Sequence, residues 1–283
     1  MKQRPRRVLV TGAGPRSLGL ATAESLAALG HEVVVTTRAT PVPGFDHHPL
    51  DLADRRSVVE FASWFGATYD GLDVLVNNAG VHLDLRKQWD EPHLLDGHEV
   101  HWRTNYLGTV HLTRALLPSV LARRGRVVHV VSKLHARGSN DAFWTRFGEA
   151  AGGPAYDSWV AYGTSKLALV HDAASLAERN RTQGLRAYSL HPGAVATGIS
   201  ARGLENSPVL GRLVAAAAPL ERLVLTSPEK GARTSVHCAT DPDAGSGYYR
   251  DARPADPAAQ AGDAEARAAL WGRTESWLKN ASD

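Results

Sequence analysis

The chain has 283 residues, 43% of them hydrophobic and 22% charged, which excludes disordered, collagen-like and disulfide-stapled proteins. Its 32 basic and 29 acidic residues leave a net charge of +3, too small an excess to indicate a nucleic-acid-binding surface. The single cysteine, Cys238, cannot form an intrachain disulfide, and no apolar run approaches the ~20 residues of a membrane span. A basic arm at 1–6 leads directly into a predicted strand, so we expect a cytoplasmic protein.

Short apolar runs rich in β-branched residues alternate with helical stretches along the chain, and neither a repeat nor a linker divides it. The strands are predicted at 7–10, 32–37, 47–50, 72–76, 126–131, 185–190 and 247–250. The helices are predicted at 18–29, 55–65, 96–120, 160–183, 207–220, 228–239 and 264–278. This alternation predicts one α/β domain over 1–283, a Rossmann-type doubly wound parallel sheet with helices on both faces.

Ligands of such sheets bind at the carboxyl ends of the strands. The predicted strands place one residue each at that edge: Thr11, Thr37, Asn77, Ser132 and His191.

A glycine-containing turn, from Thr11 to Gly19, joins the first strand to the first helix. Glycine lets the backbone approach a pyrophosphate, and the start of the helix supplies free N–H groups and a favourable dipole. The turn therefore indicates a dinucleotide, although glycine turns without ligands are common.

The strongest chemical signal is Tyr162 with Lys166, four residues apart on one face of a predicted helix. A nearby ammonium lowers the pKa of a phenol and makes it usable as an acid or base near neutral pH. The pair follows Ser132, which ends its own strand, by one loop. A surface pair is the alternative, because this spacing also arises by chance.

Taken together, these motifs resemble the short-chain dehydrogenase/reductase family over essentially the whole chain. Within the family, the sequence looks most like the branch of the retinol dehydrogenases and the WW-domain oxidoreductase. The matching pieces, in order, are the Thr11–Gly19 turn, Asp51 with Leu52, Asn77–Gly80, Asn105 with Gly108, Ser132, Tyr162 with Lys166, and Pro192-Gly193 with Thr197.

The resemblance implies four catalytic residues. Tyr162 is the expected acid/base, and Lys166 lowers its pKa and binds the nicotinamide ribose. Ser132 hydrogen-bonds the substrate carbonyl oxygen, and Asn105 holds a water in a proton relay. Hydride moves between the cofactor and the substrate carbon, while the protein supplies orientation and a proton.

The resemblance also implies a nicotinamide cofactor. Asp51 is expected at the adenine, Asn77 at the adenine-side ribose and Thr197 at the carboxamide. The full set of expected cofactor-binding residues is Gly12, Gly14, Arg16, Ser17, Leu18, Gly19, Arg38, Asp51, Leu52, Asn78, Ala79, Gly80, Tyr162, Lys166, Pro192, Gly193, Val195 and Thr197.

The turn departs from the family pattern Thr-Gly-x-x-x-Gly-x-Gly. It is one residue longer, and Ser17 stands where the second glycine is expected. Because serine needs ordinary backbone angles, we expect the turn to follow a different path.

Charge favours NADP(H) over NAD(H). A free 2′-hydroxyl is usually bonded by an acidic residue after the second strand, whereas a 2′-phosphate needs a cation. Here that strand ends in Val-Thr-Thr followed by Arg38, and Arg16 precedes the substituted glycine. A guanidinium matches phosphate geometry, so both arginines are predicted to bind the phosphate.

The resemblance implies that two segments frame the substrate, a loop at 133–158 and a lid at 198–226. Aromatic residues gather in or beside the loop, which favours a bulky, apolar carbonyl or alcohol as substrate. They are Phe143, Trp144, Phe147, Tyr156 and Trp159. His135 and His191 are predicted to be hydrogen-bonded scaffold residues, and no cluster has the spacing of a metal site.

The sequence thus predicts an NADP(H)-dependent carbonyl reductase with Tyr162 as proton donor. Alternatives are an alcohol dehydrogenase working oxidatively, a non-redox epimerase or dehydratase, and a cofactor-sensing binding protein. The resemblance implies an interface between copies through the long helices at 96–120 and 160–183, and we expect a homodimer. An extension at 251–283 could cover a further interface.

Overall fold

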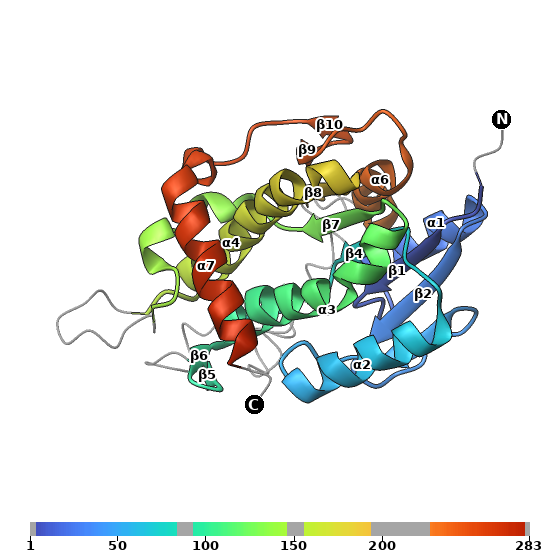
Figure 1. Ribbon diagram of the computed structural model, residues 1–283, viewed down its shortest axis with the longest axis horizontal. Helices are drawn as coiled ribbons and strands as arrows, with labels where there is room; N and C mark the ends of the chain where they lie inside the picture. The colour runs from blue at the N-terminus through green and yellow to red at the C-terminus, as the bar shows by residue number, and fades with distance from the viewer. Residues whose placement is uncertain (1–3, 84–92, 146–155, 194–226, 281–283) are drawn as a thin grey trace, which may run out of the picture.

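The computed structural model describes residues 4–83, 93–145, 156–193 and 227–280. Within these residues one sheet of eight strands forms the centre of the molecule (Figure 1). Its strands are β1 (Arg7–Thr11), β2 (Glu32–Thr37), β3 (Asp46–Pro49), β4 (Val74–Asn77), β7 (Arg126–Val130), β8 (Arg186–His191), β9 (Gly247–Arg250) and β10 (Arg253–Pro254).

The strand order is β10-β9-β8-β7-β4-β1-β2-β3, and every neighbouring pair is parallel except β9 with β10. The chain starts in the middle of the sheet at β1, builds outward to β3, and then returns to β4 to build the other half. The carboxyl ends of β1 and β4 are therefore neighbours at the point where the winding reverses, which is where such sheets bind ligands.

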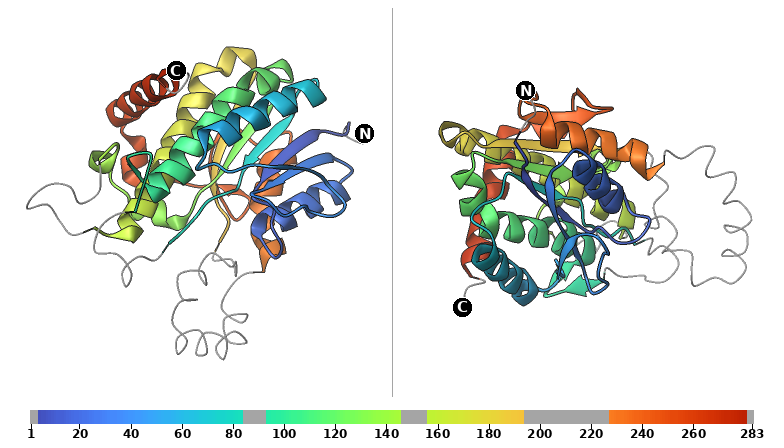
Figure 2. Two further views of the ribbon diagram at one scale, coloured as in Figure 1. Left: turned by 90° about the horizontal axis from the view of Figure 1, so that it is seen from below. Right: turned by 90° about the vertical axis from the view of Figure 1, so that its right-hand side faces the viewer.

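Helices cover both faces of the sheet (Figures 1 and 2). Helices α1 and α6 lie together on one face, and α2, α3 and α4 lie on the other. Their bounds are α1 (Leu18–Ala28), α2 (Arg55–Thr68), α3 (Thr109–Ala122), α4 (Ser158–Arg179), α6 (Pro228–Thr240) and α7 (Ala264–Lys279). The predicted doubly wound α/β fold is confirmed.

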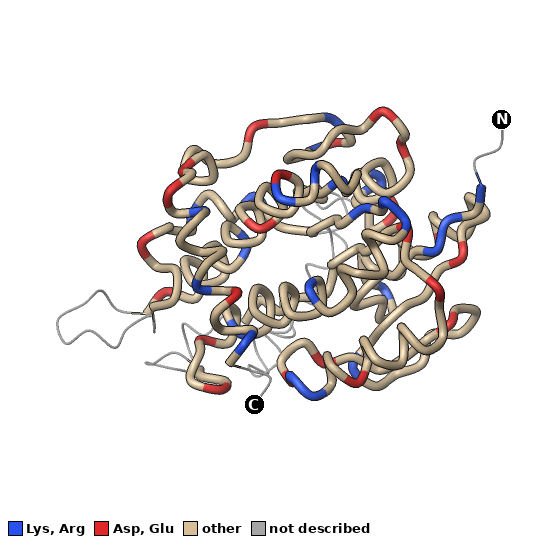
Figure 3. The backbone as a smooth tube through the Cα atoms, in the orientation of Figure 1, with Lys and Arg blue, Asp and Glu red and all other residues tan. Residues whose placement is uncertain are grey.

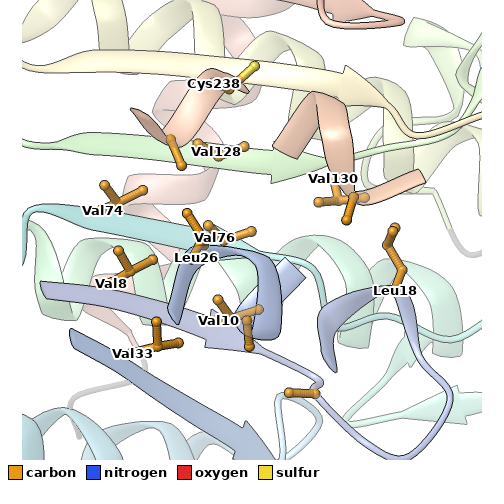
Figure 4. Packing of buried hydrophobic residues seen from close by; sticks show 14 of the residues in the cluster. Val8, Val10, Leu18, Leu26, Val33, Val74, Val76, Val128, Val130 and Cys238 are labelled. Atoms are coloured by element: carbon orange, nitrogen blue, oxygen red, sulfur yellow. The ribbon is translucent and has the colours of Figure 1, made fainter. Parts of the chain in front are cut away.

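Alternating residues of the central strands fill two separate cores. Val8 and Val10 of β1 pack toward α1 and α6, whereas Leu9 between them packs toward α2 and α3. Figure 4 shows the first core, where Leu26 of α1 and Cys238 of α6 meet the valines of four strands. Each such side chain stabilises the fold by about 1.5–3 kcal/mol when it is fully buried.

The helix predicted at 96–120 begins later and in a different form. Asp96 and Gly97 have positive φ (50° and 73°) and make the turn of a small hairpin between β5 (Leu94–Leu95) and β6 (His98–Glu99). The helix then opens with a π-helical stretch, Trp102–Gly108, before α3. Asp-Gly is a strong hairpin signal, so the local turn chemistry overrides the helical periodicity here.

One other prediction changes. The segment 133–158 is not a continuous loop, because Lys133–Arg137 and Asn140–Ala142 form short 3-10 helices. The helix predicted at 207–220 lies outside the described residues.

Helix α7 lies across α3 and α4 (Figure 1). Tyr106 in the π-helical stretch and Thr274 of α7 share a hydrogen bond of 2.7 Å between their hydroxyls. Arg114 of α3 pairs with Glu275 of α7 at 2.9 Å. The C-terminal extension thus occupies part of the outer surface of the helices through which a dimer is predicted.

Charged residues of both signs are interspersed along the described backbone (Figure 3). Within the described ranges, none of the helices combines the length and hydrophobicity needed to cross a bilayer.

A buried ionic network joins α3, α4 and the sheet. Asp172 of α4 is 3% exposed and accepts from Arg114 at 2.5 Å and from His129 Nε2 at 3.1 Å. Burial alone would raise the pKa of Asp172, but the Arg114 guanidinium and the His129 hydrogen bond lower it to about 2. The carboxylate therefore stabilises the fold in its charged form.

This network gives the protein a defined acid sensitivity. Because the folded-state pKa lies below the ordinary 3.8, the stabilisation is complete above pH 3.8 and disappears as pH falls through about 2. At one pKa unit per 1.36 kcal/mol, it amounts to about 2 kcal/mol. In urea unfolding, the difference in the free energy of unfolding between wild type and Asp172→Asn should become smaller as the pH falls from 3.8 to about 2. The exposed Asp243→Asn variant should track the wild type, and a gap independent of pH would contradict the assignment.

Candidate active site

The turn between β1 and α1 follows an unusual path. Ser17 has φ −96° and caps α1, its Oγ accepting from the Leu20 amide at 3.0 Å. The left-handed residues are instead Gly12 (φ 70°) and Arg16 (φ 57°). The expectation of ordinary backbone angles at Ser17 is confirmed. The extra residue lets Arg16 take the strained position, while the first amides of α1 remain without partners inside the helix.

This turn rests directly on the segment after β4. Asn78 Nδ2 donates to the Thr11 carbonyl at 2.9 Å, and the amides of Asn78 and Ala79 donate to Thr11 Oγ1 at 3.0 Å. A Cβ at Gly12 would lie 2.8 Å from Ala79 Cα, and one at Gly19 would lie 2.5 Å from Asn78 Nδ2. The two loops therefore meet backbone to backbone at the point where the winding reverses.

The residues expected near the adenosine half of a dinucleotide lie in the β1–α1 turn and directly after β2 and β3. Arg38 and Arg16 are both exposed and have no ion-pair partner among the described residues. Asp51 accepts from the Ala53 amide at 2.8 Å, and the Leu52 carbonyl accepts from Arg103 at 3.0 Å.

Asn77 does not reach this edge. It is 3% exposed, and its Nδ2 donates to Thr113 Oγ1 at 2.9 Å and contacts His129 Nδ1 at 3.1 Å. The expected contact with a ribose is wrong, because the side chain points into the core and joins the Asp172 network.

A close backbone contact brings Ser132 to helix α4. A Cβ at Gly163 would lie 2.5 Å from the Leu134 carbonyl oxygen, and one at Gly138 would lie 2.7 Å from the Gly163 backbone. Only glycine at both positions lets the turn after β7 rest directly on α4. As a result, Ser132 at the end of that strand lies beside Tyr162 in the first turns of the helix.

Tyr162 is held as a protonated phenol. Burial raises the pKa of Tyr162 to about 12, and its interaction with the Ser132 hydroxyl opposes that rise. The lowering of this pKa expected from Lys166, whose ammonium lies 5.7 Å from the phenol ring, is not found, because burial and Ser132 determine the pKa. At neutral pH the group is therefore in the form that a proton donor requires.

Lys166 is itself buried, with 4% exposure, and its Nζ donates to the Val130 carbonyl at 3.2 Å. Burial lowers the pKa of Lys166 to about 8. A Cβ at Gly80 would lie 3.2 Å from this Nζ and 3.1 Å from Asn105 Oδ1, so glycine leaves room for both groups.

Asn105 sits in the π-helical stretch and fastens the chain after Gly80. Its Oδ1 accepts from the Val81 amide at 2.7 Å, and its Nδ2 donates to the Val81 carbonyl at 2.9 Å. Such π-helical stretches within helices occur often at functional sites. The side-chain amide is thus engaged with the backbone, and the expected water relay would have to use another atom of the residue.

Three residues near Tyr162 are missing from the sequence prediction: His82, Glu99 and His101. His82 stacks on the Tyr162 ring, with centroids 4.3 Å apart and planes inclined by 30°. His101 approaches the same ring edge-on at 5.8 Å and bonds Glu99 at 2.7 Å. The sequence does show a cluster, His98-Glu99-Val100-His101, but its spacing does not indicate that it folds back against the helix that carries Tyr162.

The remaining expected residues divide into two groups. Pro192 and Gly193 follow β8 at the same edge of the sheet, whereas Val195, Thr197 and the lid at 198–226 lie outside the described residues. His135 Nδ1 bonds the Ser132 carbonyl at 2.7 Å, and His191 Nδ1 accepts from the Lys133 amide at 3.2 Å. Both histidines are scaffold residues, as predicted.

The aromatic residues expected at the substrate behave differently from one another. Phe143 is buried in the core against Trp102, and Trp144 meets the same indole edge-on. Phe143 thus belongs to the core, and the half-buried Trp144 packs against it. Trp159 instead meets His82 at 4.5 Å, next to Tyr162, while Phe147 lies outside the described residues. Among the residues that the structure describes, no group of three His, Cys, Asp or Glu could hold a metal ion.

Residues 12–244 match the family described as enoyl-(acyl carrier protein) reductase. The chain belongs to the short-chain dehydrogenase/reductase family. It is similar to polyprenol dehydrogenase of Mus musculus, with 34% identity over 94% of this chain and 82% of that protein. Retinol dehydrogenase 12 of Mus musculus is 33% identical over 83% of this chain and 73% of its own length.

Among solved structures, an uncharacterised protein from Mycobacterium paratuberculosis matches with a TM-score of 0.70 and 28% identity, covering 97% of this chain and 93% of the other. The predicted resemblance to the retinol dehydrogenases is confirmed. Membership of the family implies an oxidoreductase with a nicotinamide cofactor, NAD or NADP. The residues at this edge of the sheet fit such a cofactor, because the first amides of α1 open the turn after β1 and the exposed Arg16 and Arg38 lie in that turn and directly after β2.

Replacing Gly19 by alanine should disturb this cofactor site. The added methyl would overlap Asn78 and the Gly12 carbonyl, so the turn must shift at a cost of about 1–3 kcal/mol. We expect weaker binding of nicotinamide nucleotides, measured by fluorescence titration, and a lower melting temperature, measured by thermal unfolding.

The matched control is Gly66→Ala in α2, where a Cβ meets nothing within 4 Å. Because Gly66 is exposed and helical, the Gly66→Ala variant should bind nucleotide like the wild type and be more stable by about 0.5–1 kcal/mol. Wild-type binding and melting temperature in Gly19→Ala would show that the two loops do not need their close contact.

Proposed function

We propose that this chain is an NADP(H)-dependent oxidoreductase that reduces a ketone or aldehyde of a bulky, largely apolar small molecule to an alcohol. The observation that carries the proposal is the protonated Tyr162 phenol beside Ser132, with the buried Lys166 ammonium one helical turn away. A bound nicotinamide supplies or accepts the hydride. The protein then has to position the carbonyl and deliver a proton.

The side chains divide that work by their chemistry. The Ser132 hydroxyl donates a hydrogen bond to the substrate carbonyl oxygen, which fixes the carbon for attack. Tyr162 gives its proton to the same oxygen as negative charge develops there. The Lys166 ammonium stabilises the phenolate left behind, because the two groups share one face of α4.

The substrate class is supported by two kinds of observation. Trp159 stands in the first turn of α4 and meets the ring of His82, which itself stacks on Tyr162, while Tyr156 precedes the helix and bonds Glu99. Two of the relatives are named as dehydrogenases of polyprenol and retinol, which are long apolar alcohols. The same names favour the second candidate, an alcohol dehydrogenase acting in the oxidative direction. A non-redox epimerase or dehydratase has no comparable support.

The preference for NADP(H) is supported by charge at the end of β2. Arg38 and Arg16 are exposed at adjoining loops and have no described anionic partner, which suits a 2′-phosphate. The cytoplasmic location and the homodimer stay predictions. A dimer through α3 and α4 would have to form beside or over α7.

Replacing Tyr162 by phenylalanine tests the function most simply. The variant removes one hydroxyl and keeps the ring that packs against His82, so the fold should persist. Reduction of a panel of apolar ketones and aldehydes with NADPH should slow by about 10²–10⁴-fold, with little change in cofactor affinity. A folded variant that keeps wild-type turnover would mean that another group donates the proton.

The cofactor preference has its own test. Replacing Arg38 by aspartate removes a charge-assisted bond and adds repulsion, so NADPH affinity should fall by at least about 1.5–3 kcal/mol. NADH, which lacks the 2′-phosphate, serves as the internal control, and its affinity should hold or improve. Equal affinity of the wild-type protein for both cofactors would refute the assignment.

A further inference from the structure

A fully buried carboxylate lies close to the proposed proton donor without taking part in the chemistry described so far. Glu99 in β6 is 1% exposed, and its Oε1 accepts from His101 Nδ1 at 2.7 Å and from the Tyr156 hydroxyl at 2.8 Å. Its Oε2 accepts from the Trp102 amide at 2.9 Å. Burial works against the charge, but His101 and the backbone amides keep the pKa of Glu99 below its usual value. The group is therefore an ionised anchor.

His101 connects Glu99 to the segment that follows Gly80. The ring is 0% exposed, and its Nε2 accepts from the Leu83 amide at 3.0 Å. A backbone amide can only donate, so Nε2 carries no hydrogen, and the hydrogen on Nδ1 points at Glu99. Both ring nitrogens are thus occupied, and the imidazole bridges Glu99 and the Leu83 amide.

The segment is held on its other side as well. Asn105 binds both backbone groups of Val81, as described above, so residues 81 and 83 are each fastened by a buried side chain. His82 lies between these two residues, and its ring contacts two aromatic neighbours. It stacks on Tyr162 at 4.3 Å and meets Trp159 edge-on at 4.5 Å.

We propose that Glu99 and His101 are positioning residues that hold His82 against the ring of Tyr162, so that the phenol hydroxyl stays directed at Ser132 and the substrate oxygen. Through Tyr156, the same carboxylate also fixes the chain entering α4, on which Tyr162 stands. The Glu99 carboxylate is thereby connected both to the segment that carries His82 and to the chain that enters α4. The inference rests on the proposed function, because it assigns a purpose to the orientation of Tyr162 as proton donor.

The first experiment separates orientation from packing. In His82→Ala the phenol loses its cover, and kcat for carbonyl reduction should fall about 10- to 100-fold while the Kd for NADPH is unchanged. His82→Phe restores a ring at the same place and should recover most of that loss, which a titrating or hydrogen-bonding role of His82 would not allow. Glu99→Gln places an amide where only acceptors fit and should lower kcat in the same way, whereas the exposed Glu24→Gln should behave as wild type.

A second measurement does not depend on activity. The ionisation of Tyr162 is followed by near-ultraviolet difference absorbance, each variant being compared with its own Tyr162→Phe derivative. Because burial is what raises this pKa, the midpoint should fall in His82→Ala and Glu99→Gln and return in His82→Phe. Absence of any reductase activity in the wild type would refute the proposed function without affecting this titration. Wild-type midpoints and wild-type kcat in both His82→Ala and Glu99→Gln would overturn the positioning role.

Discussion

The buried ammonium of Lys166 is the constraint on which the arrangement of the site depends. Its Nζ donates to the Val130 carbonyl at the end of β7, and its pKa of about 8 records the cost of taking a cation out of water. An ammonium at this depth needs a hydrogen-bond acceptor, which the strand end supplies, and the missing side chain at Gly80 leaves room for both the ammonium and the Asn105 amide. Tyr162, one turn earlier on α4, is thereby held at the same edge of the sheet.

Backbone contacts at glycine complete this constraint. The turn after β7 can rest on α4 only because Gly138 and Gly163 lack side chains, and the π-helical stretch can reach the Leu52 carbonyl only because Gly108 does. The loops after β3 and β7 are therefore packed directly against the π-helical stretch and α4. Ser132 meets Tyr162 as a consequence of that close packing, while the β1–α1 turn is fixed independently through Thr11 and Asn78.

Regular local patterns made much of this architecture predictable. Valine-rich runs such as 32–37 and a glycine closing α1 at Gly30 are sufficient for the strands, the helix ends and the parallel order. Motif order predicted which chemical groups share the edge of the sheet. It did not predict their pKa values. Lys166 was expected to lower the pKa of Tyr162, whereas burial raises it.

The failures come from contacts that are distant in sequence. Asn77 follows a strand as a rim residue should, but His129 and Thr113 draw its amide into the core. Glu99 and His101 lie where periodicity predicts helix, and the Asp96-Gly97 turn places them instead under Tyr162. Only the folded chain brings His82 onto the phenol, so no local signal could have revealed it.

The most direct test of the account is to follow the hydride itself. The protein is incubated with an apolar ketone or aldehyde and with NADPH deuterated on either face of its hydride-donating carbon, and the product is examined by mass spectrometry. The account predicts an alcohol that carries deuterium on the former carbonyl carbon from one of the two labelled cofactors and none from the other. An unlabelled product from both, or conversion without oxidation of NADPH, would contradict it.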